Sequence, residues 1–430
     1  MKIIRSIQKN FKSELSRIID RQDTGDNTID SAVSSIIDDV KRSGDKAVIK
    51  YTRRFDGNPI LKGGIKIEEE MIRGAYSLVR REDIRGLKFA SRRIRAFHKR
   101  EMIRGWSYKE DGVMLGQICR PLEVAGLYVP GGIAAYPSSV LMNGIPAKVA
   151  GVKKIIMCVP APRGELNPLL LVAADMIGID EIYQIGGAQA IAAMAFGTET
   201  VPKVDKIVGP GNIYVATAKR LVFGTVDIDM VAGPSEVLVI ADESANPAFV
   251  AADLLSQAEH DARAMVVLVT DSTDMARRVE MELSRQLDGL ERRDIARISL
   301  KDHGAIIITR DLAEAAEISN MIAPEHLELS VRKPLSLLKK IKNAGAIFLG
   351  HYTPESTGDY VAGPNHVLPT GGTARFFSPL CVTDFIKKSN VISYQPQALK
   401  RMGKTISRFA SLEGLHGHAR AVELRLKEIG

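Results

Sequence analysis

Short apolar segments rich in Val and Ile alternate with helical patterns through the middle of the chain. Segments of this length and composition are typical of buried, mainly parallel strands that helices cover. The alternation therefore predicts an open α/β sheet with ligands at the carboxyl ends of the strands. The expected strands are Lys154–Val159, Glu181–Ile185, Lys206–Val208, Glu236–Ile240, Ala264–Val269, Ala305–Ile308 and Ala346–Leu349. The expected helices cover roughly Ser139–Ala150, Pro168–Met176, Gln189–Ala195, Ile213–Val222, Pro247–Ala262, Asp274–Gln286 and Leu312–Asn320.

Turns rich in Gly and Pro divide this pattern. Pro130-Gly-Gly and Gly233-Pro suggest boundaries near residues 127 and 235. We expect residues 127–234 to form an inserted α/β module that binds NAD, and residues 1–126 with 235–380 to form a larger α/β domain. The predicted fold has two Rossmann-like open sheets of an incomplete dinucleotide-binding type. A helical N-terminal region to about residue 105 and a helical tail over residues 381–430 complete it.

Composition excludes several classes of protein. With 430 residues, 45% of them hydrophobic and 26% charged, the chain is typical of a globular protein with more than one compact unit. Its three cysteines lie far apart without a C-x-x-C pair, which argues against a disulfide framework or a thiolate zinc site. No apolar run approaches the ~18–20 residues of a membrane helix, and no signal-peptide core is visible. We expect a reducing cytoplasm.

The net charge of +8 is concentrated in one segment, Arg80–Arg104. Clustered cations can bind a nucleic-acid backbone. However, Leu87, Ala90, Ile94 and Phe97 recur at steps of three and four residues, as on an amphipathic helix with a solvated basic face. The segment also lacks a recognisable nucleic-acid-binding module, so we favour the helix and expect no nucleic-acid partner.

A Gln-x-x-His pair ends one of the expected helices. Asn246 is a suitable N-cap with Pro247 after it, and Gln257 and His260 then lie three residues apart near the C-terminal end. An amide oxygen and an imidazole nitrogen are both competent metal ligands. Alone, the pair is more typical of an ordinary surface histidine than of a metal site, so it needs support from other segments.

That support comes from three further stretches, each with a carboxylate or histidine in unusual surroundings. They are Ala323-Pro-Glu325-His326-Leu-Glu328, Ser356-Thr-Gly-Asp359 with its continuation to His366, and Glu413-Gly-Leu-His416-Gly-His418. Together with the Gln-x-x-His pair they resemble the histidinol dehydrogenase family. Further motifs in the family's order are Gly126-Leu-Tyr128-Val-Pro-Gly-Gly132, Gly186-Gly-Ala-Gln189, Val208-Gly-Pro-Gly-Asn212 and Gly233-Pro-Ser235-Glu236.

The resemblance implies one zinc ion per subunit, bound by Gln257, His260, Asp359 and His418. Two oxygens and two nitrogens suit zinc without excluding manganese or cobalt. A single anionic ligand leaves the site positive, which favours anchoring of the substrate. Taken alone, Asp359 also suits a turn after a glycine, and His416 matches His418 in chemistry; only the resemblance selects His418.

Glu325 and His326 are the expected catalytic residues. Residues 326–331 alternate between polar and apolar side chains, which predicts a short strand with one apolar face and places neighbouring side chains on opposite sides. An imidazole suits removal of a hydroxyl proton, and a carboxylate beside it could activate water. By residue chemistry alone, a capping glutamate and a packed histidine fit equally well. The resemblance places both residues in catalysis.

Cofactor binding cannot be argued from the usual G-x-G-x-x-G fingerprint, because it is absent. Gly209-Pro-Gly211 lacks the third glycine, although a helix N-terminus after it remains a suitable anion site. The resemblance implies that Tyr128, Gln189 and Asn212 contact NAD. It also implies a substrate site formed by Ser235, Gln257, His260, His326, Asp359, Glu413 and His418. We assign His366 no ligand role.

The family's activity implies oxidation of L-histidinol through L-histidinal to L-histidine with two NAD, the last steps of histidine biosynthesis. A relative that oxidises another polar alcohol, such as a sulfonated diol, is one alternative, and a zinc hydrolase is a second. The resemblance further implies an intertwined homodimer, in which the tail carries Glu413 and His418 into the partner's site.

Overall fold

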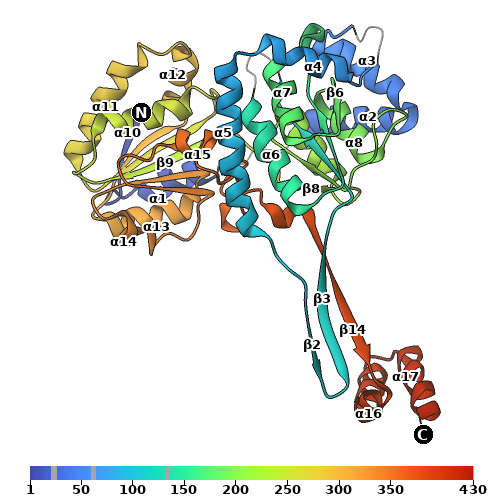
Figure 1. Cartoon of the computed structure of the whole chain (residues 1–430). Coiled ribbons are helices and arrows are strands. Elements are labelled where there is room, and N and C mark those ends of the chain that lie inside the picture. Colours follow the sequence, from blue (N-terminus) through green and yellow to red (C-terminus); the bar gives the residue numbers. More distant parts are fainter. Residues whose placement is uncertain (21–26, 60–63, 132–135, 430) are drawn as a thin grey trace. The chain divides into compact units, whose positions relative to one another are not determined.

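A computed structural model describes residues 1–20, 27–59, 64–131 and 136–429. Two compact units are present: residues 1–101 with 122–385, and residues 102–121 with 386–430. The first unit holds two parallel sheets, and the second holds an antiparallel sheet with two helices (Figure 1). Gly132, the last residue of the first glycine motif, lies outside the described residues. Among those residues, no helix has the length and apolar character that crossing a membrane requires.

The larger parallel sheet has the strand order β1-β11-β10-β9-β12-β13. Its strands are β1 (Lys2–Arg5), β9 (Glu236–Ala241), β10 (Met265–Thr270), β11 (Gly304–Ile308), β12 (His326–Ser330) and β13 (Ala346–Leu349). Alternate side chains of β9 face opposite layers, since Val237 packs in one core cluster and Leu238 in the other. The first layer contains α10 (Pro247–Ala258), α11 (Thr273–Leu287) and α12 (Arg293–Asp302). The second contains α1 (Phe11–Ile19), α13 (Leu312–Ile322) and α14 (Pro334–Leu338).

The second parallel sheet has the order β6-β5-β4-β7-β8. Its strands are β4 (Val124–Tyr128), β5 (Lys154–Cys158), β6 (Glu181–Tyr183), β7 (Lys206–Val208) and β8 (Asp227–Ile228). Helices between them are α6 (Pro137–Ala150), α7 (Pro168–Ile177), α8 (Gly187–Phe196) and α9 (Ile213–Val222). In both sheets the chain moves outward one way from a central strand and then reverses, between β4 and β7 and between β9 and β12. Such a reversal is a topological switch point.

The N-terminal helices pack on the helices that flank the second sheet. They are α2 (Asn27–Ser43), α3 (Asp45–Asp56), α4 (Glu69–Leu78) and α5 (Arg81–His98). Val33 and Ile37 of α2 share a core cluster with Ile191 of α8 and Val215 of α9. The strands of this sheet all fall between residues 124 and 228, and helices from residues 27–98 cover the helices that flank it. The three-part domain division stays a prediction.

The basic segment forms α5, as its spacing indicates. Ala90 and Ile94 are buried, whereas Phe97 is 37% exposed, so the apolar stripe is narrower than the sequence pattern. Arg93 donates to the carbonyls of Val361 and Ala362, so part of its charge is used within the fold.

The second unit contains a three-stranded sheet of order β14-β3-β2. Its strands are β2 (Trp106–Glu110), β3 (Val113–Pro121) and β14 (Ile386–Tyr394), and the helices α16 (Pro396–Leu412) and α17 (His416–Ile429) follow. These helices approach closely at Gly403, where an added Cβ would lie 2.8 Å from Leu426 Cδ1.

The α/β class, the two parallel sheets and the helical regions at both ends are confirmed. Two local expectations were wrong. The N-terminal region begins with strand β1, and the expected helical tail contains strand β14 before its two long helices. Both strands are mostly exposed edges, so their sequences lack the apolar pattern of a buried strand. Pairing with β11 and with β3 supplies the structure that their own side chains do not specify.

Candidate active site

The expected catalytic residues lie at the amino ends of β9 and β12. His326 is the first residue of β12 and pairs with Val237 of β9. Helix α10 runs back from the carboxyl end of β9, so its last turn brings Gln257 to the same edge. Asn246 caps this helix by accepting from Ala248 N at 2.9 Å, as expected. The expected catalytic residues and ligand pair thus lie at the amino edge of this sheet and not at its carboxyl ends, because the return helix carries the ligand pair to that edge.

His326 has its two ring nitrogens in different surroundings. Nδ1 lies 3.0 Å from the carbonyl oxygen of Glu236, and a carbonyl can only accept, so Nδ1 carries the hydrogen. Nε2 is buried and has no hydrogen-bond partner among the described residues. Burial lowers the pKa of His326 to about 3, helped by His260 and His366 nearby. The ring is therefore neutral at pH 7, with Nε2 as its open proton acceptor.

Glu325 is held by the backbone of β9. Its Oε2 accepts from Glu236 N at 2.9 Å, and its own N–H donates to Glu236 Oε2 at 3.3 Å. Burial and the Glu236 carboxylate raise the pKa of Glu325. Its Oε2 is 3.6 Å from His326 Nδ1, so these neighbours converge instead of pointing apart. The alternation expected of a strand fails here because Glu325 precedes β12, after Ala323 at φ +51° and Pro324.

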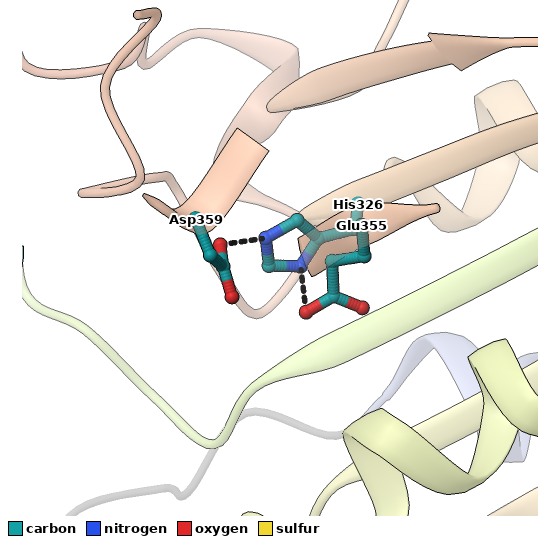
Figure 2. Close-up of side chains that lie close together, drawn as sticks. All are labelled: His326, Glu355 and Asp359. Atoms are coloured by element: carbon teal, nitrogen blue, oxygen red, sulfur yellow. Dashed lines mark ion pairs between the residues drawn. The ribbon is translucent and has the colours of Figure 1, made fainter. Parts of the chain in front are cut away.

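A short helix, α15 (Glu355–Tyr360), adds two carboxylates (Figure 2). Asp359 Oδ1 lies 3.8 Å from His326 Nε2, and Glu355 Oε1 lies 3.8 Å from His326 Nδ1. Burial raises the pKa of Asp359 to about 6. Burial also raises the pKa of Glu355, with Asp359 and Glu325 as further causes. Among the described residues, Glu325, Glu355 and Asp359 form no ion pair with a Lys or Arg. A bound cation would therefore be strongly stabilised beside them.

Gln257 is fully buried beside these carboxylates. With its amide nitrogen facing Glu355, it donates to Oε2 at 2.8 Å and to Oε1 at 2.6 Å. That orientation leaves the amide oxygen of Gln257 free to bind a cation. Glu355 thus orients the expected ligand, in the way that outer-shell carboxylates orient metal ligands.

One group of described side chains has the geometry of a metal site: His326, Glu355 and Asp359, whose ligand atoms lie within 4.8 Å of one another. Of the four expected ligands, only Asp359 belongs to this group. His260 follows α10, and its N–H donates to the Gln257 carbonyl at 3.1 Å. His418 lies in α17 of the second unit and is exposed there.

Sequence reasoning missed Glu355 and gave His366 no role. Glu355 precedes Asp359 by four residues, a spacing that places both on one face of a helix and could have identified it. His366 Nε2 is buried without a partner among the described residues, and its pKa is lowered to about 4 by burial. No local pattern marks His366, because its position depends on the fold around it.

The remaining expected substrate residues come from two places. Ser235 precedes β9 at the same amino edge, and its carbonyl accepts from Met265 N at 3.0 Å. Glu413 ends α16 in the second unit and is exposed there, as is His416, the alternative to His418.

The three expected NAD contacts lie at the carboxyl edge of the second sheet. Tyr128 ends β4, and its hydroxyl accepts from Gly187 N at 3.1 Å. Gln189 in α8 is buried, and neither of its amide atoms has a partner within the described residues. Asn212 caps α9 on the far side of the switch between β4 and β7. An unsatisfied buried amide at a switch point is typical of a site for a polar ligand.

Comparisons with known proteins agree along the whole chain. The profile of the histidinol dehydrogenase family matches residues 19–426. A histidinol dehydrogenase of Syntrophotalea carbinolica is 53% identical over 429 residues, covering 100% of both chains. One of Geobacter metallireducens is 52% identical over 432 residues, covering 100% of this chain and 99% of its own. A crystal structure of histidinol dehydrogenase from Elizabethkingia anophelis has a TM-score of 0.94 at 40% identity, covering 100% of this chain and 98% of that chain. The chain therefore belongs to the histidinol dehydrogenase family.

Proposed function

We propose that this chain oxidises L-histidinol through L-histidinal to L-histidine, reducing two NAD. The observation that carries the proposal is the state of His326, a neutral buried imidazole that lies beside three carboxylates and whose Nε2 has no partner among the described residues. Oxidation of an alcohol requires a group that accepts the hydroxyl proton as hydride leaves.

His326 accepts that proton at Nε2. Its hydrogen bond from Nδ1 to the Glu236 carbonyl fixes the ring orientation and the tautomer. The same bond stabilises the imidazolium that forms, since a carbonyl accepts more strongly from a charged donor. His326 is therefore the principal base of the first oxidation.

Glu325 activates water for the second oxidation, in which the hydrated aldehyde loses hydride. Its raised pKa makes the ionised carboxylate a better proton acceptor than an exposed glutamate. Its bond from Glu236 N holds one oxygen in place and leaves the other for water.

Zinc fits the donor atoms of this site. Helix α10 carries Gln257, the turn after it carries His260, and α15 carries Asp359. Gln257 contacts Glu355, and Asp359 lies close to His326. Gln257, His260 and Asp359, with His418, would hold the ion. When bound, the ion supplies a positive anchor for the substrate's amine and imidazole and offsets the buried carboxylates. Ser235 and Glu413 complete the substrate site.

NAD binds at the carboxyl edge of the second sheet, through Tyr128, Gln189 and Asn212. The unpartnered amide of Gln189 and the position of Asn212 at the N-terminus of α9 support this placement. We also propose a homodimer in which Glu413 and His418 are contributed by the partner subunit.

Counting NADH formed per histidinol tests the activity. The zinc-loaded protein should release about two NADH per histidinol consumed, because both oxidations use the same cofactor. One NADH per substrate, with a stable aldehyde product, would indicate a different alcohol dehydrogenase. Turnover without nicotinamide would indicate a hydrolase.

A further inference from the structure

A buried ion pair lies next to the expected cofactor contacts. Lys219 of α9 pairs with Asp229, which follows β8, and their side chains are only 2% and 1% exposed. Burying two charges costs nearly as much free energy as their attraction returns, so such a pair is a poor source of stability. The effect of this pair therefore lies in the backbone geometry that its hydrogen bonds hold in place.

Both members of the pair bind the same residue, Gly209. Lys219 Nζ donates to the Gly209 carbonyl at 2.9 Å, and Asp229 Oδ2 accepts from Gly209 N at 2.7 Å. The second oxygen of Asp229 accepts from Met230 N at 2.6 Å. The pair therefore satisfies both backbone groups of one loop residue and ties together the ends of β7 and β8 and the middle of α9.

Gly209 begins the loop that ends at Asn212. Its φ of +116° is a conformation that side-chain-bearing residues rarely adopt. A Cβ at this position would lie 2.0 Å from the carbonyl oxygen of Tyr128. The loop thus lies directly against the end of β4, where another expected NAD contact is found.

Asn212 has one polar atom left for a ligand. Its Oδ1 accepts from Tyr214 N at 3.1 Å and from Val215 N at 3.2 Å, which caps α9. Only the Nδ2 group can then donate to a cofactor. Where that group points depends on the path of the loop from Gly209, since the cap fixes the side chain to the backbone.

We propose that Lys219 and Asp229 are a positioning pair that holds the Gly209–Asn212 loop in the shape that presents the Asn212 amide to NAD. The inference rests on the proposed function, in which Asn212 contacts the dinucleotide. Neither member of the pair touches the cofactor. They set cofactor affinity through the loop.

The test is the double variant Lys219→Met/Asp229→Leu, which removes both charges together and leaves no unpaired one. The KM for NAD should rise about threefold to tenfold, the range that loss of one hydrogen bond gives. The kcat at saturating NAD and the KM for histidinol should stay within about twofold, because the amino edge of the larger sheet is untouched. An unchanged KM for NAD in a folded variant overturns the proposal.

A control pair of the same residue types lies nearby, on β7 and β8. Lys206 at the start of β7 pairs with Asp227 of β8 at 2.8 Å, and Asp227 also accepts from the following backbone N–H, as Asp229 does. This pair does not contact the Gly209–Asn212 loop. Lys206→Met/Asp227→Leu should leave the KM for NAD unchanged. An equal rise in this control would show a general structural role and overturn the proposal.

Two further variants distinguish failure of the positioning role from failure of the proposed cofactor contact. If the double variant does not fold, Asp229→Asn retains the shape and should still raise the KM for NAD about twofold to threefold; no rise overturns the proposal. Asn212→Ser keeps a capping oxygen but lacks the amide donor. If Asn212→Ser leaves the KM for NAD unchanged, the proposed cofactor contact fails. If it raises this KM while the Lys219 and Asp229 variants do not, only the positioning role fails.

Discussion

Individual side chains at the amino edge of the larger sheet are tuned by burial. The same desolvation keeps His326 neutral and drives protons onto Glu325 and Glu355, because a buried group resists whichever form is charged. The imidazole is thus ready to accept a proton, and a bound cation would favour the ionised form of the carboxylates.

Replacing His326 with Asn should slow histidinol oxidation on the order of 10²–10⁴-fold, because the amide cannot accept the hydroxyl proton. Zinc content, measured by metal analysis of the same sample, should be nearly unchanged. This measurement is needed because His326, Glu355 and Asp359 together have the geometry of a metal site. Stoichiometric loss of zinc would make His326 a metal ligand instead of a base.

Replacing Glu325 with Gln should affect the second oxidation more than the first. The amide retains the hydrogen bond from Glu236 N but cannot take a proton from water. Rates measured separately with histidinol and histidinal should show the larger loss with the aldehyde. Equal losses in both half-reactions would remove the role in water activation.

At the scale of elements, each sheet brings a group of the expected site residues to its switch point, but on opposite edges. Tyr128 and Asn212 follow the carboxyl ends of β4 and β7, whereas Glu236 and His326 begin β9 and β12. The second arrangement depends on α10, whose return path ends at Gln257. At the carboxyl edge of the second sheet, the critical feature is the close approach of the Gly209–Asn212 loop to the end of β4.

Gly209→Ala should destabilise the protein more than Gly224→Ala. Both residues have positive φ, at +116° and +95°, so each alanine carries a strain of about 1–3 kcal/mol. At Gly224 no described atom lies within 4 Å of the added Cβ, but at Gly209 the Tyr128 carbonyl is 2.0 Å away. Overpacking should add about 1–3 kcal/mol, measured by denaturant unfolding. Equal losses would mean that the loop moves freely away from β4.

For the whole molecule, the carboxylate cluster links stability to metal binding. The folded-state pKa of Asp359 is about 6, above its ordinary value of 3.8, so the folded protein binds more protons between these limits. Without metal, this one group costs roughly 3 kcal/mol at pH 7, and the cost disappears as the pH falls toward 4.

Metal-free protein should therefore gain thermal stability, relative to zinc-loaded protein, when the pH is lowered from 7 to 5. Asp359→Asn is the matched control, since it cannot ionise and should show a smaller gain. Unfolding midpoints of the two forms across this pH range provide the measurement. A metal-free protein that loses stability in parallel with the loaded form would contradict the linkage.

The proposed homodimer makes a prediction for mixed subunits. Inactive His260→Ala and His418→Ala chains should regain partial activity when subunits exchange, because a heterodimer with shared sites has one site that carries neither change. Heterodimers purified by two different affinity tags provide the assay. If verified heterodimers stay inactive, each metal site is assembled within one chain.

The sequence by itself determined the fold class and selected the candidates for the reacting groups. The buried strand Lys206–Val208 was predicted with its observed bounds, because burial on both faces favours continuous apolar side chains. Motif order selected Glu325, His326, Gln257 and Asp359. Edge strands β1 and β14 escaped prediction, since backbone pairing specifies them more than their side chains do.

Only the tertiary structure decided how these groups act. The tautomer of His326 depends on the Glu236 carbonyl, which is ninety residues away in the chain. The orientation of Gln257 depends on Glu355, and the path of the Gly209 loop depends on Lys219 and Asp229. Hydrogen bonds and desolvation are set by distances across the fold, and a sequence pattern specifies only the distances within one element.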